Sequence, residues 1–257
     1  MLRESSADVA VIVGNDQMEI FTADHVPAFA VFRGDHVEGH PRSAEFLAQL
    51  PPGIAEAERD RTPAAYTEWP CVPELGRHII ESLMAARFDV AQLTALPRGE
   101  RGSNAAPHAY SFLYRRLMRD DVLPHVPIFL NTFYPPNQPD AARCFAFGQE
   151  IGRAIDAWDS DHKVAIFASG GWSHFVIDEE LDQVVLSGLM SGDGEALSAI
   201  EESLFQSGTS EVKNWIAVAG IMNVAGLGFD LVDYVPCYRS LAGTGNAMAF
   251  GRWCERV

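Results

Sequence analysis

Residues 9–13 read VAVIV, five consecutive apolar residues of which four are β-branched. A continuous apolar run of this length is typical of a strand buried on both faces, as in a parallel sheet covered by helices. Two further runs have the same character, VPIFL at residues 126–130 and VAIFA at residues 164–168. We therefore expect these three segments to be neighbouring strands of one mainly parallel sheet.

Segments with helical periodicity separate these runs. Apolar residues recur every four positions from Leu75 to Leu83, and residues 144–158 alternate steps of four and three behind a candidate capping residue, Asp140. A further helix is expected over about residues 210–222. Strands that alternate with helices predict a single α/β domain, with a mainly parallel central sheet and helices on both faces.

Composition excludes several classes of function. The 257 residues are 47% hydrophobic and include 35 acidic but only 19 basic side chains, so the formal charge is −16. Such a surface repels phosphate backbones and anionic lipids, which argues against nucleic acid and membranes as partners. The four cysteines have no metal-binding or disulfide spacing, which predicts a cytoplasmic protein. No apolar run approaches the roughly 18 residues of a membrane span.

Polar loops follow all three predicted strands. The first strand runs into NDQ at residues 15–17, the second into NTFYPP at 131–136, and the third into SGGWSH at 169–174. Because ligands of open parallel sheets bind beyond the carboxyl ends of the strands, we expect these loops to form one polar pocket.

Three side chains in or near this pocket carry candidate chemistry. His174 follows two glycines, and its imidazole can transfer protons near neutral pH, although a loop histidine can also be bonded only to backbone. Glu211 opens a predicted helix, where a carboxylate can bind a metal or simply complement the helix dipole. Gln17 and Asp16 are candidate pocket residues or turn residues that end the first strand.

The other histidines and one glycine-rich segment carry weaker signals. His108 precedes an aromatic-rich helix, so core packing and a pocket role are both open. We expect surface positions for the remaining six histidines: His25, His36, His40, His78, His125 and His162. The segment GTGN at residues 243–246 has two glycines of a dinucleotide loop, but no apolar strand precedes it and no third glycine follows at the required spacing.

Longer blocks around these residues resemble a known family. They read VAVIVGNDQMEIF (9–21), FLNTFYPPNQPDAARCFAFGQEIGRAI (129–155), ASGGWSHFVIDEELD (168–182), GTSEVKNWIAVAG (208–220) and AGTGNAMAFGRW (242–253). In this order they resemble the catalytic, beta-type (LigB-like) subunit of class III extradiol ring-cleaving dioxygenases, the family of protocatechuate 4,5-dioxygenase and gallate dioxygenase. The resemblance implies that residues 1–257 form one such catalytic domain.

The resemblance also implies an activity and a set of site residues. Family members use a non-haem Fe(II) ion, held by two histidines and one glutamate, to open a catechol-type ring with O₂. Here it implies that Glu211 is the carboxylate ligand and His174 the separate acid/base. Gln17 stands where members have a histidine ligand, and His108 and Asn131 are implied substrate contacts.

Two departures from the family pattern change these expectations. Ring-cleaving members begin with a strand that ends in a Ser-His pair and supplies one ligand, whereas this chain begins at what resembles their second strand. The second departure is Gln17, because a neutral amide oxygen is a weaker donor to Fe(II) than imidazole. We therefore expect this shortened form to bind little iron and to have negligible ring-cleaving activity. A missing strand also predicts a bare sheet edge, covered by a loop or by a homo-oligomer.

Three functions remain open at this point. The first is extradiol cleavage of a small aromatic substrate by O₂, with or without an alpha-type helper subunit. The second is a metal-poor relative that binds a small aromatic or regulates, which Gln17 favours. The third is another metal-dependent reaction, such as hydrolysis with Zn²⁺ or Mg²⁺. Iron content and oxygen uptake with catechols discriminate the first two.

Overall fold

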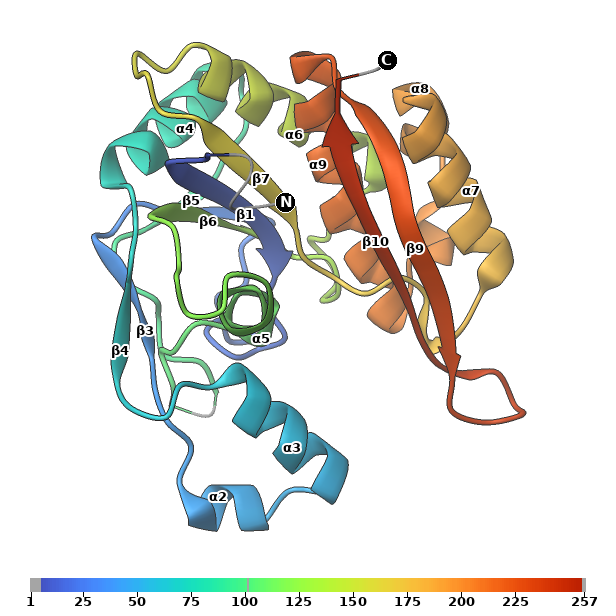
Figure 1. The fold of residues 1–257 in the computed structure, drawn as a ribbon. Helices are drawn as coiled ribbons and strands as arrows, with labels where there is room; N and C mark the ends of the chain where they lie inside the picture. The colour runs from blue at the N-terminus through green and yellow to red at the C-terminus, as the bar shows by residue number, and fades with distance from the viewer. Residues whose placement is uncertain (1–5, 101, 256–257) are drawn as a thin grey trace.

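The computed structural model describes residues 6–100 and 102–255, which are built around a five-stranded sheet. The strand order is β5-β2-β6-β1-β7 (Figure 1). The bounds are β5 Ala91–Leu93, β2 Phe29–Phe32, β6 His125–Leu130, β1 Val9–Asn15 and β7 Val164–Ala168. β1 lies between β6 and β7 and is parallel to both, whereas β2 is antiparallel to β6 and parallel to β5. The predicted mainly parallel sheet with these three neighbouring strands is confirmed.

Helices cover both faces of this sheet (Figure 1). On one face, α4 (Pro73–Ala85) contacts β2 and β6, α9 (Val212–Ala225) contacts β1 and β7, and α6 (Ala141–Asp156) packs between α4 and α9. On the other face, α5 (His108–Phe112) contacts β1 and continues into a π-helical turn, η1 (Leu113–Leu117). None of the helices within the described residues has the length and apolar character that a membrane span requires.

Alternate residues of β1 face two separate apolar cores. Val9, Val11 and Val13 pack with residues of α4, α6 and α9. Ala10 and Ile12 point the other way and pack with aromatic residues of α5 and η1. All five are at most 3% exposed. A strand buried on both faces gains nothing from polar alternation, so its sequence is uniformly apolar.

The helix boundaries agree with the predicted capping signals. The side chain of Asp140 accepts a hydrogen bond of 2.7 Å from the backbone N–H of Arg143 and caps α6 as expected. A 3₁₀ turn, η3 (Ser207–Glu211), leads directly into α9. Residues 212–222 of α9 are buried on all sides, because other elements surround this helix.

A second, antiparallel sheet was not predicted. β9 (Gly228–Tyr238) and β10 (Thr244–Cys254) form a long hairpin, which β8 (His174–Val176) joins in the order β8-β10-β9 (Figure 1). Residues 243–246 lie at the end of the hairpin turn and the start of β10, which excludes a dinucleotide loop there. α7 (Glu179–Ser191) packs on β9, and α8 (Gly194–Ser198) packs on α7. A short 3₁₀ turn, η2 (Glu202–Leu204), precedes η3.

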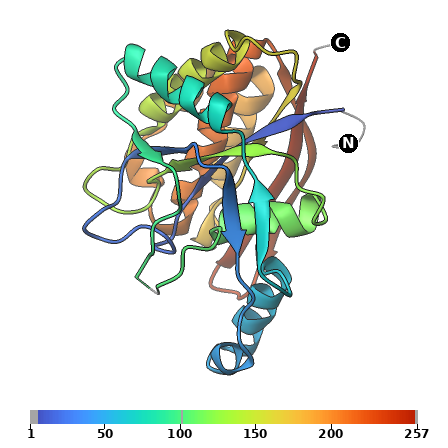
Figure 2. The same cartoon turned by 90° about the vertical axis from the view of Figure 1, so that its left-hand side faces the viewer.

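A small lobe extends away from the central sheet (Figure 2). It consists of the antiparallel strands β3 (His36–Gly39) and β4 (Thr67–Pro70), which α2 (Ala44–Ala48) and α3 (Pro52–Arg61) connect along the chain. α3 contacts both α5 and η1, which connects the lobe to the face of the sheet that carries α5.

The prediction that His125 lies at the surface is wrong. His125 is the first residue of β6 and is 0% exposed. Tyr114 donates its hydroxyl to His125 Nε2 at 2.6 Å, and His125 Nδ1 donates to the carbonyl of Leu123 at 3.0 Å. Burial lowers the pKa of His125 to about 4. Of the other five histidines, His25 and His162 are exposed, and His36, His40 and His78 are half-buried.

Candidate functional site

Glu211 lies at the centre of the pocket formed by the strand ends. Glu211 is the last residue of η3, and its side chain is buried. Gln17 Nε2 and Asn15 Nδ2 donate to Oε1 at 3.2 and 3.4 Å, and the backbone N–H of Gly171 donates to Oε2 at 2.8 Å. These donors come from the carboxyl ends of β1 and β7. The structure thus brings the two strand-end loops together around one carboxylate.

His174 faces the same carboxylate. Its Nε2 lies 3.9 Å from Glu211 Oε1, and the residue is 9% exposed. Nδ1 lies 2.6 Å from the carbonyl oxygen of Trp172. Because a carbonyl only accepts hydrogen bonds, Nδ1 carries the hydrogen, and Nε2 of the neutral ring keeps a lone pair. In its neutral form, His174 therefore presents a proton acceptor beside Glu211.

Two glycines hold the imidazole of His174 in place. A Cβ atom at Gly208 would lie 2.2 Å from His174 Cδ2, and one at Gly171 would lie 3.0 Å from Cε1. The ring is therefore packed between two stretches of bare backbone, which is the close approach expected after the Gly-Gly pair. Gly208 was not singled out in the sequence, because it precedes Glu211 and is far from His174 along the chain.

A buried carboxylate supports the loop that carries His174. Asp182 of α7 is 0% exposed and accepts hydrogen bonds from the backbone and the hydroxyl of Ser173, at 3.0 and 2.6 Å. Tyr234 of β9 donates to the same carboxylate at 2.7 Å. Burial raises the pKa of Asp182. Sequence reasoning missed this residue, because nothing in its neighbourhood indicates partners on two other elements.

The amides of Asn15 and Asn214 organise the other side of Glu211. Asn214 in α9 is buried and donates to Asn15 Oδ1 at 2.9 Å and to the carbonyl of Ser169 at 2.8 Å. This contact fixes the oxygen of Asn15, so that its N–H₂ group faces Glu211. Asn214 lies one turn after Glu211, and that spacing is the signal that could have identified it.

Gln17 approaches Glu211 with its nitrogen. Besides the bond from Nε2 to Glu211, Gln17 Oε1 accepts a hydrogen bond from Tyr134 Oη at 3.4 Å. The amide oxygen, the only side-chain atom of Gln17 suited to bind a cation, therefore lies on the side away from the carboxylate. In this arrangement Gln17 is a hydrogen-bond donor to Glu211.

Asp16 closes the turn after β1. Its carboxylate accepts hydrogen bonds from the backbone N–H groups of Glu19, Ile20 and Phe21 at 3.0–3.1 Å. Burial raises the pKa of Asp16 to about 6, even though these donors act in the opposite direction. Of its two open interpretations, the turn role is the one that the structure supports.

His108 is held by a carboxylate that the sequence analysis missed, Glu19. Nδ1 of His108 contacts Glu19 Oε1, and the backbone N–H of His108 donates to both oxygens of Glu19, at 3.1 and 3.2 Å. Arg61 Nη1 lies 3.2 Å from Glu19 Oε2. Burial alone would raise the pKa of Glu19, but the hydrogen bond from His108 and the charges of His108 and Arg61 lower it to about 2.

Asn131 is not brought together with the other candidates. It is buried in the loop after β6, where Nδ2 donates to the carbonyl of Tyr134 and to Asn137 Oδ1, both at 2.7 Å. Oδ1 accepts the backbone N–H of Tyr134 at 2.9 Å. Asn131 therefore organises its own loop and is not among the residues that line the cavity described next.

A cavity of about 1240 Å³ runs along the outer edge of β7. All five residues of β7 line it, together with residues of α5, η1, α6, α9 and β10. Beyond the carboxyl end of β7 it reaches His108, His174 and Glu211. Within residues 6–100 and 102–255, β7 has β1 as its only strand partner. The cavity therefore joins an open sheet edge to the candidate site.

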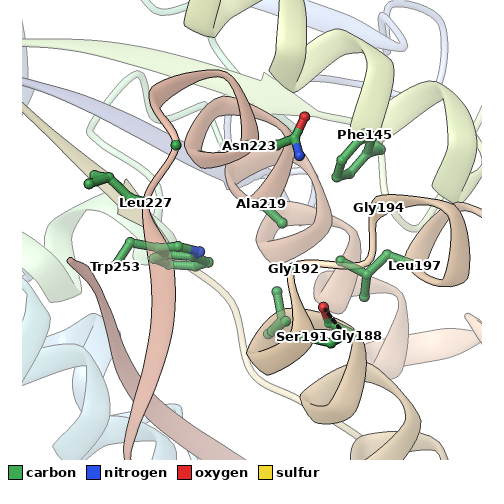
Figure 3. A pocket seen from close by; sticks show the side chains of 12 residues that line it. Phe145, Gly188, Ser191, Gly192, Gly194, Leu197, Ala219, Asn223, Leu227 and Trp253 are labelled. Atoms are coloured by element: carbon green, nitrogen blue, oxygen red, sulfur yellow. Dashed lines mark hydrogen bonds between the residues drawn. The ribbon is translucent and has the colours of Figure 1, made fainter. Parts of the chain in front are cut away.

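A smaller cavity of about 270 Å³ lies between α6, α7, α8, α9 and the end of β10 (Figure 3). Phe145, Leu197 and Trp253 are among the side chains that line it, with several glycines and Asn223. Its lining holds no acidic, basic, histidine or cysteine side chain. It provides no group for acid/base or metal chemistry.

The donor set around Glu211 does not by itself fit a three-ligand iron centre. Such a centre needs two imidazoles and a carboxylate around one ion. In the described part of the chain, no three His, Cys, Asp or Glu side chains are grouped so that they could hold one metal ion. Glu211 is surrounded by two amides, a backbone N–H and the imidazole of His174. Glu211 supplies a carboxylate ligand, and Gln17 donates a hydrogen bond to it instead of directing its oxygen toward an ion.

Two comparisons with known proteins found sequences similar to this chain. A family model described as the catalytic LigB subunit of aromatic ring-opening dioxygenase matches residues 2–244, a range that contains every candidate residue named above. A gallate dioxygenase of Pseudomonas putida is 37% identical over 108 residues, which cover 41% of this chain. The matched region spans 29% of that relative's length.

Proposed function

Because the chain belongs to the family of catalytic LigB subunits of aromatic ring-opening dioxygenases, we propose that its site binds a catechol-type ring for extradiol opening by O₂. The observation that carries the proposal is the placement of His174 Nε2, a proton acceptor, 3.9 Å from the Glu211 carboxylate at the end of the cavity. A vicinal diol must lose a proton to react, and this acceptor is in position to take it.

The roles of the residues follow from their surroundings. His174 accepts a proton from a substrate hydroxyl at Nε2, because its Nδ1 is already bonded to the carbonyl of Trp172. Gly171 and Gly208 pack against the imidazole of His174 and restrict its orientation, so Nε2 is held in place before the substrate binds. Glu211 supplies the negative charge of the site. The apolar lining of the cavity accepts the face of an aromatic ring.

Ring opening of this kind depends on Fe(II), which transfers electron density between a catechol and O₂. We propose Glu211 as the carboxylate ligand of that ion. Because the described residues do not complete the centre, a functional iron site requires two further strong ligands. The 257-residue chain on its own is expected to retain well below one iron per chain.

A second function is favoured by the contact between Gln17 and Glu211. The N–H₂ group of Gln17 donates a hydrogen bond to Glu211 Oε1, a carboxylate oxygen that a metal ion would need as a ligand. A site in this state binds an aromatic diol through hydrogen bonds alone, which describes a metal-poor binding or regulatory relative. Both functions share the aromatic ligand and differ in iron and oxygen consumption.

One experiment tests the ligand and separates the two functions. The purified chain is titrated anaerobically with 4-nitrocatechol, whose absorption spectrum reports its ionisation, with and without added Fe(II). We expect the wild type to bind 4-nitrocatechol saturably as the anion. We expect His174→Gln to bind it only as the neutral catechol. Oxygen uptake with protocatechuate, gallate and 3-O-methylgallate is then measured. Absence of binding under both conditions contradicts the proposal, and uptake that depends on iron excludes the binding-only function.

A further inference from the structure

Glu19 and His108 form an ordered pair at the edge of the site. The carboxylate of Glu19 receives both the ring Nδ1 and the backbone N–H of His108. Two contacts to one residue, from its side chain and from its main chain, restrict the rotation of the ring about its side-chain bonds. His108 lines the cavity that also reaches His174 and Glu211.

The contact with Glu19 decides which atom of His108 is available to a ligand. A carboxylate accepts hydrogen bonds, so Nδ1 carries a hydrogen directed at Glu19. Nε2 is the remaining polar atom of the ring, and the side chain of His108 is 39% exposed. A ligand in the cavity can therefore reach Nε2 but not Nδ1.

Glu19 is itself held from a third side. Arg61 Nη1 lies 3.2 Å from Glu19 Oε2, and the two side chains are only 13% and 17% exposed. A partly buried ion pair is screened less by solvent than a surface pair. Glu19 thus has a fixed position from which it can orient another side chain.

We propose that Glu19 is a positioning residue, which holds His108 so that Nε2 contacts an oxygen of the bound ring opposite His174. This inference rests on the proposed function, since it assigns His108 a contact with the same catechol-type ligand. Glu19 acts only through His108 and touches no ligand itself. Its other contact gives a partner to the backbone N–H of His108, the first residue of α5.

The test is a double-mutant cycle with 4-nitrocatechol as ligand. Glu19→Gln is expected to weaken binding about 10-fold, the size of one charge-assisted hydrogen bond. In a His108→Ala background the same substitution is expected to have no further effect. Glu56→Gln, which removes an exposed carboxylate of α3 paired with Arg59, serves as the control and leaves binding unchanged. An undiminished effect of Glu19→Gln in the His108→Ala background overturns the proposal.

A second readout does not depend on the ligand. Nitrogen-15 chemical shifts of the imidazole show whether Nδ1 of His108 carries a strongly hydrogen-bonded hydrogen. We expect this signature in the wild type and its loss in Glu19→Gln, and an unchanged signature would contradict the positioning role. If Glu19→Gln unfolds, Glu19→Asp keeps the charge, moves it back by one methylene, and is expected to weaken binding in the same direction. Failure of the wild type to bind 4-nitrocatechol would refute the proposed function, while the shifts still decide the role of Glu19.

Discussion

At the scale of single residues, the site is organised by which atom each polar group turns toward Glu211. Gln17 turns its nitrogen, His174 turns Nε2, the ring nitrogen that is not bonded to Trp172, and Asn15 turns its N–H₂ group because Asn214 holds the oxygen. The N–H groups of Gln17, Asn15 and Gly171 donate to the carboxylate, which is therefore hydrogen-bonded without a cation. Exchanging one donor for a ligand should therefore change what the site binds.

Gln17→His is expected to increase affinity for Fe(II). An imidazole at this position replaces a donor amide by a strong ligand next to Glu211. We expect at least about a 10-fold gain, because even groups outside the ligand shell change metal affinity by that amount. Gln138→His is the matched control, since Gln138 bonds only to the carbonyl of Phe133. Equal iron affinity of the two variants, measured by anaerobic titration, would show that position 17 does not face the metal site.

His125 makes stability depend on pH. Its pKa is about 4 in the folded protein and 6.5 ordinarily, so the unfolded chain takes up the proton first as pH falls. The contribution of neutral, buried His125 to the free energy of unfolding is complete above pH 6.5. It is lost as pH falls from about 6.5 to 4, a decrease of about 3 kcal/mol in the free energy of unfolding. Urea unfolding of wild type and His125→Gln at several pH values should therefore diverge over this interval. His162→Gln, at an exposed position, should follow the wild type, and parallel curves for His125→Gln would contradict the assignment.

At the scale of elements, the helix layer depends on very close backbone contact between α6 and α9. A Cβ atom at Gly148 would lie 1.8 Å from the carbonyl oxygen of Ala217, and one at Gly220 would lie 2.2 Å from that of Phe145. The two helices therefore meet with backbone against backbone. Since α9 begins directly after Glu211, the position of α9 also sets the position of the site.

Gly148→Ala is expected to destabilise the protein. Forcing the helices apart costs about 1–3 kcal/mol or more, which exceeds the roughly 1 kcal/mol that alanine gains in helix propensity. Gly53→Ala in α3 is the control, because its added Cβ would meet no atom within 4 Å beyond its chain neighbours and the nearby backbone of its own helix. Thermal unfolding should show a lower melting temperature for the first variant only. A neutral effect at Gly148 would mean that the helices pack less closely than described.

The elements also differ in how far their sequence predicts them. β1 and β6 are buried throughout and α4 and α6 along one face, so their apolar patterns identify them. The apolar run of β7 also identified a strand, but the prediction that it is buried on both faces is wrong, because β7 ends the described sheet and its five residues are half-buried beside the cavity. β9 and β10 were missed, because one face of this ribbon is exposed and residues such as Val232 and Phe250 are apolar yet lie at the surface. Of the candidate site residues, Gln17 and His174 were singled out because they follow predicted strands, and Glu211 because it opens a predicted helix; the structure brings the three side chains together. Glu19 and Asp182 act through partners on other elements, which no local pattern encodes, whereas the position of Asn214 one turn after Glu211 could have identified it.

At the scale of the whole molecule, an acidic chain has β7 at one end of its central sheet, without a second strand partner in the part that the structure describes. The formal charge of −16 opposes association of two copies, whereas the outer edge of β7 and its apolar cavity favour it. Salt screens the repulsion but leaves apolar contact intact. Which tendency prevails should therefore depend on ionic strength.

We expect the chain to self-associate more strongly as salt is raised. Ala165→Lys, which places a charge on β7 inside the cavity, should reduce association, as measured by sedimentation velocity. Ala142→Lys, with the same charge change at an exposed position of α6, should not. Equal sedimentation of the two variants, or a monomer at every salt concentration, would contradict association through this edge.

The ion pair between Arg61 and Glu19 connects the peripheral lobe to the pocket. Local opening of α3 would withdraw Arg61 and leave Glu19 to hold His108 alone, so the order of the pocket is linked to the fraying of a helix outside the main core. By reciprocity, a molecule that binds at His108 should slow amide hydrogen exchange in α3, although it does not touch that helix. The lobe would then report occupancy of the pocket through its own protection from exchange.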